Sequence, residues 1–74
     1  MNAVERVDVE WIGDQRASYL TVQAVAGSVA LSKGSNMIAM VDAFKVAQAI
    51  LRVGAHIENN SGPCARALSA IQRS

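Results

Sequence analysis

The sequence has very little cysteine, proline or aromatic residue. Cys64 is the only cysteine among the 74 residues, so no disulfide can form within one chain. A lone cysteine is more typical of a reducing compartment than of a secreted protein. Cys64 and the single histidine, His56, supply only half of the ligands that a structural zinc ion takes. We therefore predict neither a metal site nor a cofactor.

Long apolar runs and a strong net charge are also missing. No apolar stretch approaches the roughly 20 residues of a membrane-spanning helix. The N-terminus reaches an acidic side chain already at Glu5 and shows no signal-peptide core. We expect a cytoplasmic protein with no membrane partner. Seven basic and six acidic residues give a net charge of +1. Because DNA binding needs a dense basic surface, nucleic acid is a disfavoured partner.

Alanine is the residue that the sequence has in abundance. Apolar residues make up 51% of the chain, but thirteen of them are alanine and only Trp11, Tyr19 and Phe44 are aromatic. Alanine buries little area, and a chain of this length buries only about 60–65% of the surface that it exposes when unfolded. We predict a single domain over residues 1–74 with a marginal core of its own. A homo-oligomer, most simply a dimer, would supply the missing burial.

The first part of the chain has the pattern of a β-meander. Val7, Val9 and Trp11 alternate with charged residues, as in a half-buried strand. Residues 18–25 are rich in β-branched and aromatic side chains, which favours a second strand. Short strands are also expected at 29–32 and 37–40, with turns at 13–16, 26–28 and 33–36.

The middle of the chain also allows a helix. Leu20, Ala24, Gly27 and Leu31 stand at helical spacing. Several valines and Gly27 itself disfavour this alternative, because β-branched residues and glycine are poor helix formers. The sequence leaves the choice between two strands and one helix over 18–32 open, with strands preferred.

Two helices are expected after residue 41. Asp42 is placed to cap the first one. That helix ends either at Gly54 or at Asn59-Asn60. Pro63 suits the first position of a short second helix, capped by Ser61 or Gly62. One apolar face of the first helix contains Ala43, Val46, Ala47, Ile50 and Leu51, opposite Lys45, Gln48 and Arg52.

The predicted fold class is therefore α+β. We expect a small antiparallel meander of three to four strands, packed by one long amphipathic helix and a short C-terminal helix.

No set of residues supports catalysis. Cys64, early in a helix, and His56 together resemble a thiolate pair, but Cys64 also fits the apolar stripe of its helix. Asp8 and Glu10 share one strand face, which is the ordinary pattern of a solvated face. We predict that the protein is not an enzyme.

A small anionic ligand is the ligand class that the residues favour. Lys33, Ser35 and Asn36 lie in a glycine-containing turn, where backbone N–H groups can form an anion nest. Their order does not match a P-loop, in which lysine follows glycine. Arg52 and Arg66 are the further candidates for such a site at a subunit interface.

Protein–protein interaction is the function that the sequence favours. Trp11, Tyr19, Met37 and Met40 are the candidate interface residues. We expect a homo-oligomeric, non-catalytic binding protein that inhibits or sequesters an unidentified protein partner. Its size and pattern resemble small accessory proteins of phages and mobile elements, a similarity that assigns no role to any residue. The alternatives are a nucleotide-binding sponge or sensor and a nucleic-acid-binding regulator.

Overall fold

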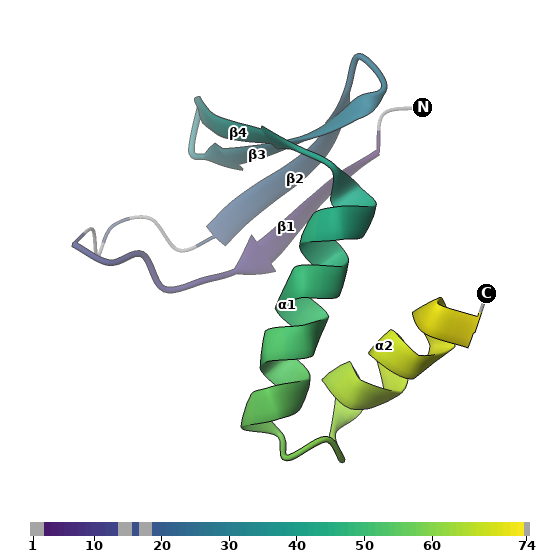
Figure 1. The fold of residues 1–74 in the computed structure, drawn as a ribbon. Coiled ribbons are helices and arrows are strands. Elements are labelled where there is room, and N and C mark those ends of the chain that lie inside the picture. Colours follow the sequence, from purple (N-terminus) through teal and green to yellow (C-terminus); the bar gives the residue numbers. More distant parts are fainter. Residues whose placement is uncertain (1–2, 14–15, 17–18, 74) are drawn as a thin grey trace. The chain divides into compact units, whose positions relative to one another are not determined.

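The fold consists of four strands followed by two helices. The computed structural model describes residues 3–13, 16 and 19–73 (Figure 1). This architecture confirms the predicted α+β class and rules out the alternative helix over 18–32. The elements are β1 (Val4–Asp8), β2 (Tyr19–Val25), β3 (Ser28–Lys33), β4 (Asn36–Val41), α1 (Ala43–Ile57) and α2 (Pro63–Arg73).

The first strand begins and ends earlier than its sequence pattern suggests. β1 pairs with β2, and Asp8 lies opposite Tyr19, the first residue of β2. Residues after Asp8 have no partner in β2, so Val9 and Trp11 lie outside the strand although their alternation continues. The predicted turn at 13–16 falls partly outside the described residues, which include only Gly13 and Arg16 of it.

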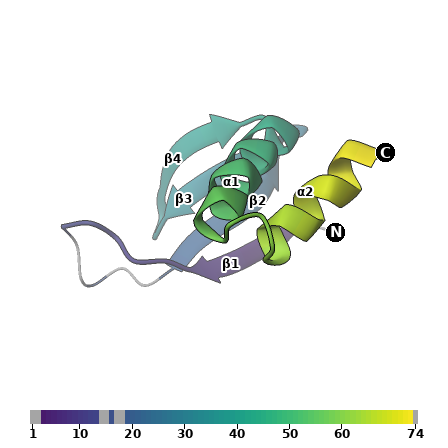
Figure 2. The ribbon, with the colours of Figure 1, turned by 60° about the horizontal axis from the view of Figure 1, so that its bottom comes forward.

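The four strands form one antiparallel sheet in chain order, β1-β2-β3-β4 (Figure 2). Each strand pairs with its neighbour in sequence, and a register shift between Leu31 and Ser32 interrupts the β3–β4 ladder. The register separates the two faces. Leu20, Val22 and Leu31 belong to an apolar face, whereas Thr21, Gln23 and Ala30 belong to the other.

The described residues bury very little. Only Ala30, which is 0% exposed, and Ala55, at 3%, count as buried core, and no larger described side chain is fully buried. The register places Ala30 between Gln23 on β2 and Met40 on β4. Both buried residues are alanines, and the core is small, as we expected from the sequence.

The turn between β2 and β3 holds two residues with positive φ. Ala26 has a φ of 51° and Gly27 a φ of 81°, as a type I′ hairpin turn requires. Alanine is unfavourable in this conformation, whereas asparagine tolerates it.

We expect Ala26→Asn to raise the free energy of unfolding by about 0.5–1 kcal/mol in urea titrations. Ala24→Asn, in the adjoining strand, should lower it; a loss of stability in Ala26→Asn would contradict the turn type.

The chain divides into two compact units, Met1–Asp42 and Ala43–Ser74. The first is the four-stranded sheet and the second is the helical hairpin of α1 and α2, so each is described by itself. Among the described residues, neither helix has the length and apolar character to cross a membrane. The single-domain organisation stays a prediction.

Candidate interaction surface of the helical hairpin

The first helix ends at Ile57 and is followed by a turn that contains two asparagines. Asn59 and Asn60 have φ values of 58° and 65°, and the Asn60 N–H donates to the Ala55 carbonyl at 2.7 Å. Asparagine adopts this left-handed conformation more readily than most residues, which is why it follows helix C-termini. Of the two predicted ends, the later one is confirmed, and Gly54 lies inside α1.

The carboxylate of Glu58 caps the second helix. It accepts the Cys64 N–H at 3.2 and 3.0 Å on its two oxygens and the Ala65 N–H at 3.4 Å. Gly62 occupies the cap position, because its carbonyl accepts the Arg66 N–H at 3.2 Å. The Ser61 hydroxyl instead donates to the Glu58 carbonyl at 3.1 Å. Gly62 is thus the right one of the two predicted caps, and the side-chain partner is Glu58.

The sequence analysis missed this capping role of Glu58. The sequence signal that could have revealed this role is the short separation between Glu58 and Pro63, because proline marks the first position of α2. A carboxylate just before that position, across a short loop, is suited to the unpaired N–H groups and to the positive end of the helix dipole.

Gly54 allows α1 and α2 to approach closely. A Cβ atom at Gly54 would lie 2.6 Å from Sγ and 3.1 Å from Cβ of Cys64. Glycine is therefore required here by a neighbouring helix, although it is a poor helix former.

Cys64 packs against Gly54 at the start of α2. It is half-buried against Gly54. Its hydrogen bond to Glu58, together with partial desolvation and the negative charge of Glu58, raises the pKa of the thiol. This overrides the lowering that a helix N-terminus would cause, so the thiolate is disfavoured. The interpretation of Cys64 as a stripe residue fits this environment better than the pairing with His56.

The pKa of Glu58 predicts acid sensitivity of the hairpin. Partial desolvation raises this pKa, but hydrogen bonds from Cys64 and Ala65 and the charge of Arg66 outweigh it and hold the pKa below 4.5. A carboxyl group whose pKa is lower in the folded than in the unfolded state stabilises the protein at pH values above its unfolded-state pKa. This stabilisation is lost as the pH falls through the folded-state pKa. We therefore expect the melting temperature to fall once the pH is lowered below 4.5.

Glu58→Gln tests this prediction directly. The variant should melt several degrees lower near neutral pH and lose the part of the acid dependence that Glu58 causes, as measured by circular dichroism across pH. Glu5→Gln, on the exposed β1 strand, is the matched control. Equal acid profiles for wild type and Glu58→Gln would contradict the capping role.

The apolar surface of α1 is wider than α2 covers. The face of α1 on which Gly54 approaches Cys64 of α2 is buried or half-buried; it contains Leu51, Gly54 and Ala55. A second strip lies about 120° further round the helix at 3.6 residues per turn. Three of its side chains are strongly exposed: Ile50 and Val53 at 63% and Ile57 at 76%. We call this the α1 strip; its members are Val46, Ile50, Val53 and Ile57.

The α1 strip has the spacing of a helix–helix seam. Its members follow one another at four, three and four residues, the alternation found in coiled coils. None of them is charged, and the positions beside them include Ala47, Ala49 and Gly54, which are small. A second helix therefore meets small residues at these three positions, and the exposed His56 is the larger flanking residue near Ile57. Sequence analysis identified Val46 and Ile50 but not Val53 and Ile57, which continue the same period.

The five predicted ligand-binding residues do not come together within either unit. Lys33, Ser35 and Asn36 belong to the β3–β4 turn of the sheet, where the Lys33 ammonium lies 5.0 Å from the Trp11 ring. Arg52 and Arg66 belong to the helical hairpin, on α1 and α2 respectively. Their joint role in a site stays a prediction.

The predicted interface residues all lie in the sheet unit. Met37 and Met40 of β4 are 55% and 48% exposed. Tyr19 carries the Arg6 guanidinium 4.8 Å above its ring, and Trp11 is half-buried beside Lys33. The indole Nε1 has no hydrogen-bond partner among the described residues. Of these four side chains, Met37 and Met40 are the exposed apolar ones.

Charge is unevenly divided between the two units. Residues 43–74 contain four basic side chains and one carboxylate, whereas residues 1–42 contain three basic and five acidic ones. The helical hairpin is therefore the basic part of the molecule. No three potential metal-ligating side chains gather anywhere in the described residues. No family model, curated protein or solved structure matches this chain.

Proposed function

We propose that the protein is a small, non-catalytic binding module that works as a homo-oligomer, most simply a dimer, and inhibits or sequesters a partner protein. The observation that carries this proposal is the α1 strip. Three large aliphatic side chains on one line of a helix remain more than 60% exposed. Each would contribute about 1.5–3 kcal/mol if it were fully buried.

The small core supports the same proposal. Ala30 and Ala55 together bury little apolar area, and ten large hydrophobic side chains of the described residues are exposed. Single exposed hydrophobic residues are ordinary, but a continuous line of them marks an interaction site. Self-association would bury this apolar surface against a second copy of the same chain.

A second copy suits the α1 strip because the strip is neutral and regular. In a two-fold symmetric contact each residue meets the same surface on the other subunit, so a charged strip would repel itself. The alternating spacing lets the side chains of one helix fit between those of another.

A partner protein would then bind outside the α1 strip. Met37 and Met40 are suitable because unbranched, polarisable side chains adapt to varied surfaces. A cytoplasmic location and an accessory role of the phage or mobile-element type belong to the same proposal; they rest on the single cysteine and the small size.

Light scattering coupled to size exclusion tests the oligomer. The chain has a mass of 7.8 kDa, so a dimer at micromolar concentration gives twice that value. A mass of one chain over the whole concentration range would overturn the oligomer. Affinity capture from the native host, followed by mass spectrometry, tests the partner: specific recovery of one protein supports the proposal, and no enrichment over an unrelated bait counts against it.

A further inference from the structure

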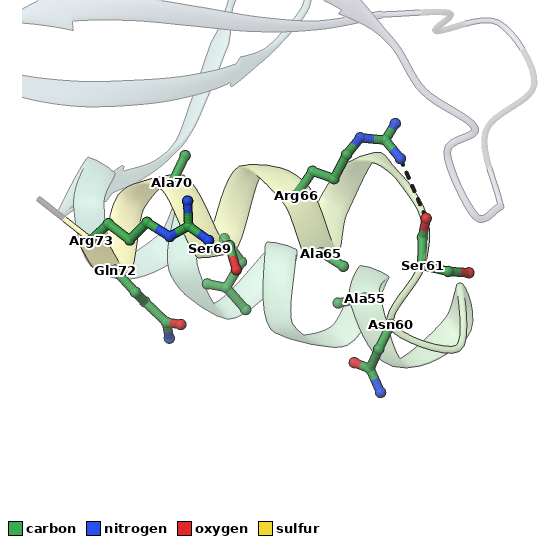
Figure 3. Close-up of a pocket in the computed structure, with 10 residues that line it drawn as sticks. Ala55, Asn60, Ser61, Ala65, Arg66, Ser69, Ala70, Gln72 and Arg73 are labelled. Carbon is green, nitrogen blue, oxygen red and sulfur yellow. Dashed lines mark hydrogen bonds between the residues drawn. The ribbon is translucent and has the colours of Figure 1, made fainter.

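The helical hairpin carries an open hollow of about 580 Å³ on the α2 side (Figure 3). Ala55 and the loop residue Asn60 contribute from the α1 end, and the remaining lining comes from Ser61 and from α2. A volume of this size falls within the range of small-molecule sites, about 300–1,000 Å³. It shares no residue with the α1 strip.

Two arginines and no carboxylate line this hollow. Arg66 and Arg73 stand seven residues apart on α2, about 10 Å along the axis and therefore on the same face. One Arg66 nitrogen donates to the Ser61 carbonyl at 3.3 Å in an exposed hydrogen bond, and the guanidinium keeps further N–H donors for a ligand. The one nearby carboxylate, Glu58, is engaged at the α2 cap. The hollow therefore favours an anion.

The rest of the lining combines a small apolar floor with hydrogen-bonding groups. The half-buried Ala65 and Leu68 provide the apolar surface, and Ala55, only 3% exposed, lies beneath it. Ser69 and Gln72 add donors and acceptors near Arg73 (Figure 3). A ligand that matches both parts has a planar apolar portion and an anionic group held by arginine.

We propose that this hollow binds a nucleoside phosphate, with the phosphate on Arg66 and Arg73 and the base over Ala65 and Leu68. Nucleic acid fits less well, because a strand needs a continuous basic track. The remaining basic residues of the hairpin, Lys45 and Arg52 on α1, do not line the hollow. This site goes beyond the proposed interaction function and does not depend on it.

Isothermal titration of the full chain with AMP and, separately, with inorganic phosphate tests the proposal. We expect AMP to bind and Arg73→Gln to weaken it by about tenfold or more, because a charge-assisted hydrogen bond is lost. Arg66→Gln should act in the same way. Arg52→Gln removes an equal charge from the polar face of α1 and should leave the AMP dissociation constant within about twofold.

Ser69→Trp provides a second route to the answer, since it fills the hollow without a change in charge and should also abolish AMP binding. Circular dichroism of each variant identifies those that fold. The proposal is overturned if AMP does not bind, if Arg52→Gln weakens binding as much as Arg73→Gln, or if inorganic phosphate binds as tightly as AMP. Tighter binding of a single-stranded oligonucleotide than of AMP would overturn it in favour of nucleic acid. None of these results depends on the oligomeric state.

Discussion

Replacing Ala30 with glutamate is expected to remove a large part of the protein's stability. Ala30 is 0% exposed and lies between Gln23 and Met40 in the register of the sheet. A carboxylate at this position would lose its hydration without gaining a cation opposite it. An unpaired buried charge costs about 3–5 kcal/mol. A chain of this size has a total stability of about 4–11 kcal/mol at ordinary values per residue, so this loss removes a large part of it.

Ala24→Glu is the matched control for this substitution. Ala24 is on the neighbouring strand β2, is exposed, and belongs to the opposite face of the sheet. We expect its free energy of unfolding to stay within about 0.5 kcal/mol of wild type. Guanidinium titrations followed by circular dichroism measure both variants. If Ala30→Glu were as stable as Ala24→Glu, the register that buries Ala30 would be wrong.

The strands were predictable because their signals are local. β-branched residues and positive-φ turn residues occur at the right intervals, so β2, β3 and β4 were placed within one or two residues. The start and end of β1 were not, because they depend on which residues of β2 are available for pairing. Val9 and Trp11 have the strand pattern but lie beyond Tyr19, where β2 has no residue to pair with them.

The helices show the same division. Their positions follow from apolar periodicity, from Asp42 before α1 and from Pro63 at the start of α2. The contacts that hold the hairpin together join residues several positions apart across the loop. The Glu58 cap and the Gly54–Cys64 approach are therefore invisible to periodicity. Gly54 was one of two predicted helix ends because a glycine in a helical pattern can either end the helix or allow a second helix to approach. Only the position of the neighbouring helix distinguishes these two roles.

The candidate surfaces were only partly predictable, for a related reason. An apolar position in a helical pattern does not reveal which neighbour covers it. Leu51 and Ile50 are adjacent in sequence and both aliphatic, yet Leu51 is half-buried and Ile50 is 63% exposed. Likewise, Arg66 was a candidate from its charge, whereas Arg73 gains its role only from the hollow that both residues line.

The substitution Val53→Lys is expected to convert the proposed dimer into a folded monomer. Val53 lies near the middle of the α1 strip, between Ile50 and Ile57, and is 63% exposed. In an isologous contact the change introduces two like charges at the centre of one interface, one from each subunit. Even with the lysine side chain bent toward solvent, we expect the dimer dissociation constant to rise by about 100-fold, or about 2.7 kcal/mol.

The measurement has two parts, because a folded monomer and an unfolded chain both lose the dimer mass. Light scattering should give 7.8 kDa for Val53→Lys, while circular dichroism retains the helical signal. Gln48→Lys adds the same charge on the polar face of α1 and should remain dimeric. The melting temperature should rise with concentration for wild type and Gln48→Lys but not for Val53→Lys, since only a dimer is stabilised by mass action. A dimer mass for Val53→Lys equal to that of wild type would instead mean that the α1 strip is not the contact surface, and the proposed oligomer would then lose the observation that supports it.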